Sequence, residues 1–455
     1  MTPPYDVEQL RAKVAEVLPG LRQDLEDLVR IESVSADPAR AGEVERSAEA
    51  VRALLAAEGC ETSIVTAEGG APAVIAHKPG PEGAPTVLLY AHHDVQPEND
   101  HSEWESAPFE PTERPSPSGP RLYGRGAADD KAGVVAHLAA LRIFGDDLPV
   151  GVTLFIEGEE EVGSDTLAAL LREHRDRLAA DVIVIADSGN WDIGVPALTT
   201  SLRGLVRADV EVRTLTHAVH SGMWGGLVPD ALMALTRLLA SLHDDTGNVA
   251  VEGLHRGPAA DVDYPEERLR AESGALPDVR WIGDGSVVER LWTRPSLTIT
   301  GLDAPQVDGA SNTLVASARA KLSLRIAPGD TTANAVECLR RHCEQHVPWG
   351  AELSFTVVDT GEATRIDATG PAYDAARSAF SDAWDGTPPV DMGIGGSIPF
   401  IAEFLETFPE ASVLVTGVED PDTRAHGANE GLHLAEFERV LLAEALLLAR
   451  LGAAG

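Results

Sequence analysis

The stretch at positions 86–97 reads TVLLYAHHDVQP, and the rest of the chain is arranged around it. Its first five residues form an apolar run that follows a segment rich in Pro and Gly, which is typical of a buried strand. His92 and Asp94 come directly after this run, and in open α/β sheets ligands bind beyond the carboxyl ends of strands. A His and an Asp at this spacing can act as a metal ligand and the carboxylate that orients it, although most such triplets are surface loops.

Length and composition set the class of protein. A chain of 455 residues is too long for one ordinary core, so we expect two domains. The apolar content of 44% and the charged content of 24% are ordinary for a soluble globular protein, and no apolar run approaches the length of a membrane span. The first residues, MTPPYDVEQLRAK, do not resemble a signal peptide, so we expect a cytoplasmic protein.

The charge balance and the cysteines exclude several kinds of partner and site. With 36 Lys and Arg against 73 Asp and Glu, the net charge of −37 repels nucleic acid and anionic membranes. We expect these carboxylates to solvate the surface, and the lesser alternative is that some of them gather around a cationic cofactor. The three cysteines contain no Cys-x-x-Cys pair, which argues against a disulfide framework or a thiolate zinc site.

Apolar strand patterns alternate with helical patterns through the first 200 residues and again after residue 370. This alternation predicts an α/β fold with a mostly parallel sheet flanked by helices on both faces. The segment 98–121, rich in Pro and Ser, is expected to be a loop. Strands are expected at 86–90, 150–156, 182–186 and 412–416, and helices at 131–144, 166–178, 373–384 and 434–451.

The pattern between these two parts differs. Strands are expected at 206–212, 297–300, 320–326 and 353–357, helices at 229–242 and 332–346, and irregular structure at 244–293. This β-α-β-β-α-β order resembles a ferredoxin-like module with one solvated sheet face. We therefore expect an α/β domain made of residues 1–202 and 363–455, split by an inserted α+β domain at residues 203–362.

Four more groups with metal-binding chemistry lie just past elements of the split domain. They are Asp129 in GRGAADDKAG (124–133), the acids of EGEEEVGS (157–164), Asp187 after VIVIA, and His426 in AHGANE (425–430). Alone, each is as readily a helix cap, a solvated loop or a turn. Together with His92 they form a set of His and carboxylate ligands suited to two divalent ions with one bridging carboxylate, because a parallel sheet brings strand ends together.

In this order the five motifs resemble the co-catalytic zinc exopeptidases and amidohydrolases, which include aminoacylase, succinyl-diaminopimelate desuccinylase and carnosinase-like dipeptidases. The resemblance covers nearly the whole chain. The segments 92–97, 104–109 and 395–399 look most like the carnosinase-like dipeptidase branch. Glu159 and Val162 depart from that branch, which usually has Met and Ser there, and His93 stands at a variable position with no role assigned.

The resemblance implies a centre of two divalent metal ions, with zinc expected and manganese or cobalt as alternatives. One metal would be bound by His92, Asp129 and Asp187. The other would be bound by Asp129, Glu161 and His426, so that Asp129 bridges the two. The peptide bond after the bridging Asp is cis in the family.

The resemblance also implies catalytic and substrate-binding roles. Asp94 would orient His92, and Glu160 would be the general base. The inserted domain would be a lid and dimerisation domain, whose His220 reaches the site of the partner in a homodimer. Arg325 and Ser397 would hold the substrate's carboxylate, since an Arg fork suits that group. Read without the family, these three are a loop His, a strand-edge Arg and a helix-start Ser.

The expected function is hydrolysis of dipeptides or similar small amides with a free carboxylate, by a metal-activated water with Glu160 as base. An N-acyl-amino-acid deacylase that uses the same residues is the nearest alternative, because no residue decides whether a free α-amine is recognised. A non-catalytic metal-binding protein is the alternative from another class, and the presence of the base Glu160 argues against it. The side-chain preference, the metal and the pathway are left open by the sequence.

Overall fold

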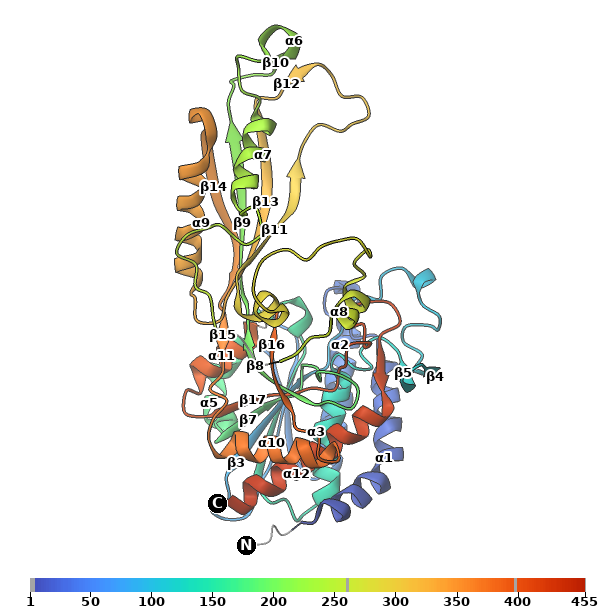
Figure 1. Ribbon diagram of the computed structural model, residues 1–455. Helices are drawn as coiled ribbons and strands as arrows, with labels where there is room; N and C mark the ends of the chain where they lie inside the picture. Colours follow the sequence, from blue (N-terminus) through green and yellow to red (C-terminus); the bar gives the residue numbers. More distant parts are fainter. Residues whose placement is uncertain (1–4, 259–261, 397–398, 455) are drawn as a thin grey trace. The chain divides into compact units, whose positions relative to one another are not determined.

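The structure is a computed structural model that describes residues 5–258, 262–396 and 399–454. The chain separates into two compact units. Unit 1 comprises Met1–Thr200, Ile366–Met392 and Pro399–Gly455, and unit 2 comprises Ser201–Arg365 and Gly393–Ile398. Figure 1 labels most of the helices and strands of the two units.

The large sheet has nine strands among the described residues, in the order β1-β2-β6-β3-β7-β17-β8-β15, with β16 also paired to β8. The four central strands β6, β3, β7 and β17 run parallel. The pairings of β1 with β2, β2 with β6, β17 with β8 and β8 with β15 are antiparallel. Parallel strands end at one edge of a sheet, so the residues that follow them are brought together. The bounds are β1 Glu61–Val65, β2 Ala73–Lys78, β3 Thr86–His92, β6 Gly151–Glu157, β7 Val182–Ile185, β8 Ala197–Leu202, β15 Thr364–Arg365, β16 Val390–Ile394 and β17 Ser412–Val415.

Helices flank this sheet, as the alternating pattern predicted. The helix α3 packs on β3 and is buried almost throughout, and Figure 1 shows α10, α12 and α3 side by side. A helix enclosed in this way carries apolar residues on all sides, which explains the run of Val, Ala and Leu in α3. The bounds are α1 Val7–Val29, α2 Ala41–Ala57, α3 Lys131–Phe144, α4 Leu167–Glu173, α5 Arg175–Leu178, α10 Pro371–Ala383, α11 Pro399–Thr407 and α12 Leu434–Ala454.

A small three-stranded sheet, in the order β18-β5-β4, corrects one prediction. The segment 98–121 was expected to be a loop, but it contains β4 (Thr112–Ser116) and the start of β5 (Gly119–Tyr123), which form a hairpin. Its Pro and Ser content concealed the strands, and Pro115 is tolerated because β4 is an edge strand. The third strand, β18 (Gly431–His433), pairs with β5 and ties the C-terminal part of the chain to this hairpin.

Unit 2 is built on an antiparallel four-stranded sheet in the order β11-β13-β9-β14, and α7 and α9 lie along it (Figure 1). With the two helices placed between strands in the chain, this is the ferredoxin-like order that the sequence predicted. Its core includes Val206, Val210, Leu235, Leu322 and Leu339. The bounds are β9 Gly204–Arg213, α7 Ala231–Ser241, β11 Ser296–Asp303, β13 Ser317–Ile326, α9 Thr332–His346 and β14 Glu352–Gly361.

Shorter elements complete unit 2. The strand β10 (Val219–His220) pairs with β12 (Thr313–Leu314), and α6 (Ser221–Trp224) follows β10 directly. The segment 244–293 was expected to be irregular, yet it contains α8 (Glu266–Ser273) and a π-helical turn, η4 (Glu289–Thr293). The sequence of α8, EERLRAES, has no apolar stripe, so its periodicity gave no helical signal.

Two further predictions can be compared with the structure. All three cysteines are free and buried, in agreement with the absence of a disulfide framework. Among the helices of the described residues, none combines the length and the apolar character that crossing a bilayer requires.

Candidate metal centre

The candidate centre lies at the carboxyl ends of the parallel strands of unit 1. The strand β3 ends at His92, which is in register with Glu157 at the end of β6. Asp187 follows β7 by two residues, so its side chain emerges at the same edge. His92 is completely buried, because β3 is a central strand with helices over it. The positions of these side chains therefore follow from the parallel pairing of three apolar strands.

Asp94 fixes the orientation of His92. The Nδ1 atom of His92 lies 3.1 Å from the backbone oxygen of Asp94 and 3.4 Å from its Oδ1, so Nδ1–H donates to Asp94 and Nε2 is left for a metal. The Asp94 carboxylate also accepts the backbone N–H groups of Glu160 and Glu161, at 3.2 and 3.1 Å. One buried carboxylate thus orients the histidine and anchors the loop that carries two acids of the site.

Asp129 joins the two halves of the centre. Its Oδ1 lies 3.2 Å from Nε2 of His92, and its Oδ2 lies 3.0 Å from Nε2 of His426. A carboxylate with one oxygen directed at each of two histidines has the arrangement that a bridging ligand needs. The peptide bond between Asp129 and Asp130 is cis, as the resemblance implied.

The other acids complete two groups whose ligand atoms lie within 4.8 Å of one another, one formed by His92, Glu160 and Asp187 and one by Asp129, Glu161 and His426. The first group differs from the ligand set that the resemblance implies. It contains Glu160, which the resemblance makes the general base, where the implied set has Asp129. Nε2 of His92 lies 3.2 Å from Asp129 and 3.8 Å from both Glu160 and Asp187. Both assignments therefore fit the distances, and the bridging position of Asp129 favours it as the shared ligand.

The electrostatics of this cluster fit divalent cations. Burial, reinforced by the charge of Asp187, raises the pKa of Glu160 well above its usual value. Burial likewise raises the pKa of Asp187 to about 7. Hydrogen bonds to Asp129 and Glu161 raise the pKa of His426 to about 11. The carboxylates thus repel one another and hold protons on the histidines, and two divalent cations would satisfy the same oxygen and nitrogen donors.

Hydrogen bonds hold Glu161 in place. Its carboxylate accepts the backbone N–H of Gln96 at 2.9 Å and the Gln96 side-chain amide at 2.8 Å. The neighbouring Glu159, at a position where the dipeptidase branch usually has Met, makes its hydrogen bonds to residues outside the candidate centre. Its carboxylate accepts the backbone N–H groups of Ala71 and Thr166, at 2.9 and 2.8 Å. Glu159 therefore ties the acidic loop to the segment before β2 and to the start of α4.

Sequence reasoning missed the role of Glu430. This carboxylate is completely buried and accepts the backbone N–H groups of Gly126, Ala128 and Asp129, at 3.0, 2.9 and 3.1 Å. Arg125 donates to it at 2.7 Å. Glu430 thus shapes the turn that presents Asp129. The only sequence signal was its place in AHGANE, four residues after His426.

The structure brings together seven of the predicted site residues in unit 1, and His220 and Arg325 belong to unit 2. His220 is exposed at the end of β10, and its Nδ1 accepts the backbone N–H of Gly222 at 3.1 Å. Arg325 is half-buried on β13, opposite Ser296. Ser397 lies outside the described residues. The seven are His92, Asp94, Asp129, Glu160, Glu161, Asp187 and His426.

Arg203 adds a feature of unit 2 that the sequence did not indicate. It is largely buried and donates to the backbone oxygen of Gly395 at 3.0 Å and to Oγ of Ser296 at 3.0 Å. Burial and the nearby charge of Arg325 lower its pKa to about 10. Arg203 therefore fastens the segment that precedes Ser397.

Comparisons with known proteins agree with this geometry. The chain is 34% identical to a cysteinylglycine-S-conjugate dipeptidase of Corynebacterium striatum, over 94% of this chain and 95% of that protein. It is 30% identical to a Beta-Ala-His dipeptidase of Rattus norvegicus, over 80% and 76% of the two chains. The crystal structure of human carnosine dipeptidase 1 superposes with a TM-score of 0.78 at 26% identity, covering 99% of this chain and 100% of that one.

These relatives confirm the resemblance to the carnosinase-like dipeptidase branch that the motifs suggested. The match to a family extends from β3 to the C-terminal helix, so it includes every candidate metal ligand. The sequence model of Peptidase family M20/M25/M40 matches residues 88–450, and the chain therefore belongs to that family of peptidases.

Proposed function

We propose that this peptidase hydrolyses dipeptides with a free carboxylate at a centre of two divalent cations. The observation that carries the proposal is the position of Asp129 between the two ligand groups. Its two carboxylate oxygens lie 3.2 Å from Nε2 of His92 and 3.0 Å from Nε2 of His426. The substrate class follows from relatives that are named for Cys-Gly conjugates and for Beta-Ala-His.

In this proposal one cation is held by His92, Asp129 and Asp187, and the other by Asp129, Glu161 and His426. The mixed His and carboxylate set suits zinc, with manganese or cobalt as alternatives. When bound, two such cations lower the pKa of a shared water and polarise the scissile carbonyl. Asp94 is not a ligand in this proposal. It binds Nδ1 of His92 and so keeps Nε2 directed toward the centre.

Glu160 is the residue left to move the proton. It would accept a proton from the attacking water and deliver it to the leaving amine. Its burial suits that task, because desolvation raises the pKa of a carboxylate and so makes it a stronger base than an exposed Glu. Asp94 binds the backbone N–H of Glu160, which holds the base beside Nε2 of His92.

Residues of unit 2 would bind the rest of the substrate. We assign the free carboxylate to Arg325 and Ser397, and the developing oxyanion to His220 of the partner subunit in a homodimer. Exposed apolar side chains next to His220 support a protein interface there, since Met223, Trp224 and Leu227 are 75%, 46% and 81% exposed. Unit 2 would then act as a lid and dimerisation domain. Three free, buried cysteines suit a reducing compartment, so we expect a cytoplasmic enzyme.

A panel of substrates tests the proposal. Cys-Gly, Beta-Ala-His and Ala-Ala should be hydrolysed in the presence of zinc, manganese or cobalt, and N-acetyl amino acids should be hydrolysed at least tenfold more slowly. The reverse preference would identify an N-acyl-amino-acid deacylase instead. No hydrolysis of any dipeptide by the metal-loaded protein would refute the assignment.

A further inference from the structure

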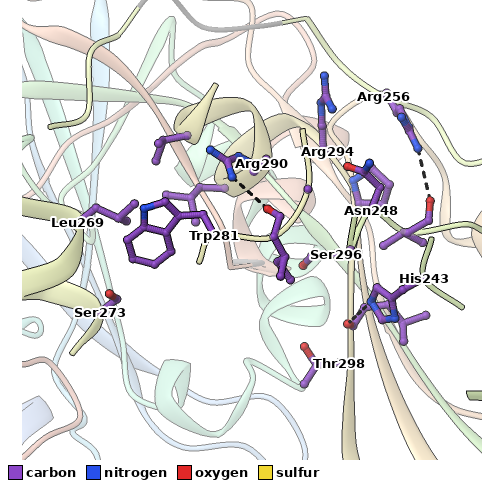
Figure 2. A pocket seen from close by; sticks show the side chains of 18 residues that line it. His243, Asn248, Arg256, Leu269, Ser273, Trp281, Arg290, Arg294, Ser296 and Thr298 are labelled. Atoms are coloured by element: carbon purple, nitrogen blue, oxygen red, sulfur yellow. Dashed lines mark hydrogen bonds between the residues drawn. The ribbon is translucent and has the colours of Figure 1, made fainter. Parts of the chain in front are cut away.

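Unit 2 contains a cavity that is made by none of the candidate metal ligands. Its volume is about 340 Å³, which is within the range of small-molecule sites. Figure 2 shows Trp281, Leu269 and Ser273 on one side of it and His243 and Thr298 on the other. Residues at 247–256 and 269–298 supply most of the wall, and many of them lie in the part that the sequence marked as irregular.

Among its described residues, the wall of the cavity is mainly apolar and carries positive but no negative side chains. Apolar side chains come from both sides, and none of the described residues that line the cavity is Asp or Glu, in a chain that has 73 of them. The lining includes Arg256, Arg290 and Arg294. The apolar part of this lining consists chiefly of Val249, Leu269, Trp281, Val287, Leu291 and Leu297.

Two of these arginines carry charge that no carboxylate balances within the described part of the chain. Arg290 donates to the backbone oxygens of Ile282 and Ser286, at 3.0 and 3.3 Å, and Arg256 donates to that of Val249 at 3.4 Å. Arg294 differs, because it pairs with Asp284 at 2.6 Å. A cavity beside two unbalanced guanidinium groups attracts an anion.

A buried donor in the same wall is also unused. The indole Nε1 of Trp281 is shielded from solvent and has no hydrogen-bond partner among the described residues. Leaving such a donor unpaired costs free energy, and a ligand oxygen would satisfy it. The cavity therefore combines an apolar wall with arginine guanidinium groups and the indole N–H donor of Trp281.

From these observations we propose that this cavity binds a small organic carboxylate with an apolar body, such as a medium-chain alkanoate. The apolar wall would hold the hydrocarbon, and Arg290 would hold the carboxylate, whose planar shape suits the guanidinium fork, while Arg256 adds positive charge at the other side of the cavity (Figure 2). Inorganic phosphate fits less well, because it is strongly hydrated and would gain nothing from the apolar wall. None of the residues that line this cavity is one that we assign to the hydrolytic centre.

Calorimetric titration of the full-length, metal-loaded enzyme tests the proposal. The probes are octanoate and 1-octanol, which share a hydrocarbon chain and differ in charge, with inorganic phosphate as a third. We expect one octanoate to bind per chain, and 1-octanol and phosphate to bind at least tenfold more weakly. Equal affinity for octanoate and 1-octanol, or no octanoate binding at millimolar concentration, would overturn the proposal.

Variants locate the binding. Arg290→Gln should weaken octanoate binding roughly tenfold, as expected for a lost charge-assisted hydrogen bond, and Arg256→Gln should weaken it less, because it removes a charge from the wall and no bond to the carboxylate. Arg319→Gln is the matched control, because it removes the same charge from β13 outside the cavity and should leave binding unchanged. Ser273→Trp places a ring at the exposed rim and should block both the acid and the alcohol.

Two further observations separate this site from the hydrolytic centre. Octanoate should still bind to Glu161→Ala, and saturating dipeptide should not displace it. If binding is lost in Glu161→Ala and unaffected in the two arginine variants, the octanoate occupies the hydrolytic centre and the cavity assignment is wrong. Hydrolysis of dipeptides is measured separately, so failure of one proposal leaves the other intact.

Discussion

The metal centre of unit 1 and the cavity of unit 2 are opposites in chemistry. The first gathers five carboxylates and two histidines at strand ends, and the second combines an apolar wall with arginines and no carboxylate among its described residues. The large negative charge of the chain does not decide the character of either site. The local arrangement of strands and loops selects which charges face inward, so each site should respond to changes in its own charges.

The strongest effect is expected at Glu160. Glu160→Ala should reduce kcat about 10²–10⁴-fold while both metals stay bound, because a general base is lost and the ligands are kept. Its neighbour Glu161 is the matched control, and Glu161→Ala should instead lose metal. Metal content and kcat measured on both variants check this, and exchanged phenotypes would show that the roles of the two acids are reversed.

His220 tests whether the hydrolytic centre draws on a second chain. His220→Ala should lose about 10²–10³-fold in activity, as for one oxyanion donor. Mixing it with Glu160→Ala and allowing subunits to exchange should restore roughly a quarter of wild-type activity, because half of the two-fold dimers are mixed and each has one complete site. If mass spectrometry confirms exchange and no activity returns, His220 does not act across an interface.

A smaller effect is expected at Glu430, which supports Asp129 without being a proposed ligand. Glu430→Gln should weaken metal binding about 10–100-fold, the range for residues that position ligands. Glu436→Gln is the control, since Glu436 is also completely buried and bonds Trp384 at 2.8 Å and Arg439 at 2.6 Å. Competition with a chelator measures the metal affinity. An equal loss of affinity in both variants would show that Glu430 acts only through general stability.

The smallest effect concerns a buried pair beneath β3, His137 and Glu444, which lie 2.9 Å apart. Burial lowers the pKa of His137, but the charge of Glu444 outweighs it and raises that pKa above 6.5. The stabilisation is thus complete below the unfolded pKa of 6.5 and is lost as pH rises through the folded value. His137→Gln should therefore destabilise the protein by about 1 kcal/mol more at pH 6 than at pH 9 in urea unfolding. A pH-independent difference would show that His137 is neutral.

The regular parts of unit 1 could be predicted from the sequence because their apolar patterns are strong. The helix at 131–144 was predicted with the bounds that α3 has, and strands at 86–90 and 182–186 were predicted within a few residues of β3 and β7. Strand ends then located His92 and Asp187, and the family resemblance supplied the register of the acidic loop. Short motifs next to clear strands are thus the features that sequence reasoning can recover.

The remaining features depend on contacts between distant residues. Glu430 binds backbone groups that lie 301 to 304 residues earlier in the chain, and no local pattern indicates such a bond. The hairpin of β4 and β5 was concealed by Pro and Ser. The cavity of unit 2 is lined largely by a segment with weak periodicity, so the cavity could not be predicted from the sequence.

Metal counting tests the central claim, that Asp129 joins two cations, most directly. Elemental analysis of purified protein, with anomalous diffraction to locate the ions, should give two equivalents per chain for the wild type and about one for Asp187→Ala. Asp129→Ala should retain neither. A wild-type protein with a single equivalent, or an Asp129→Ala variant that keeps both ions, would contradict the account.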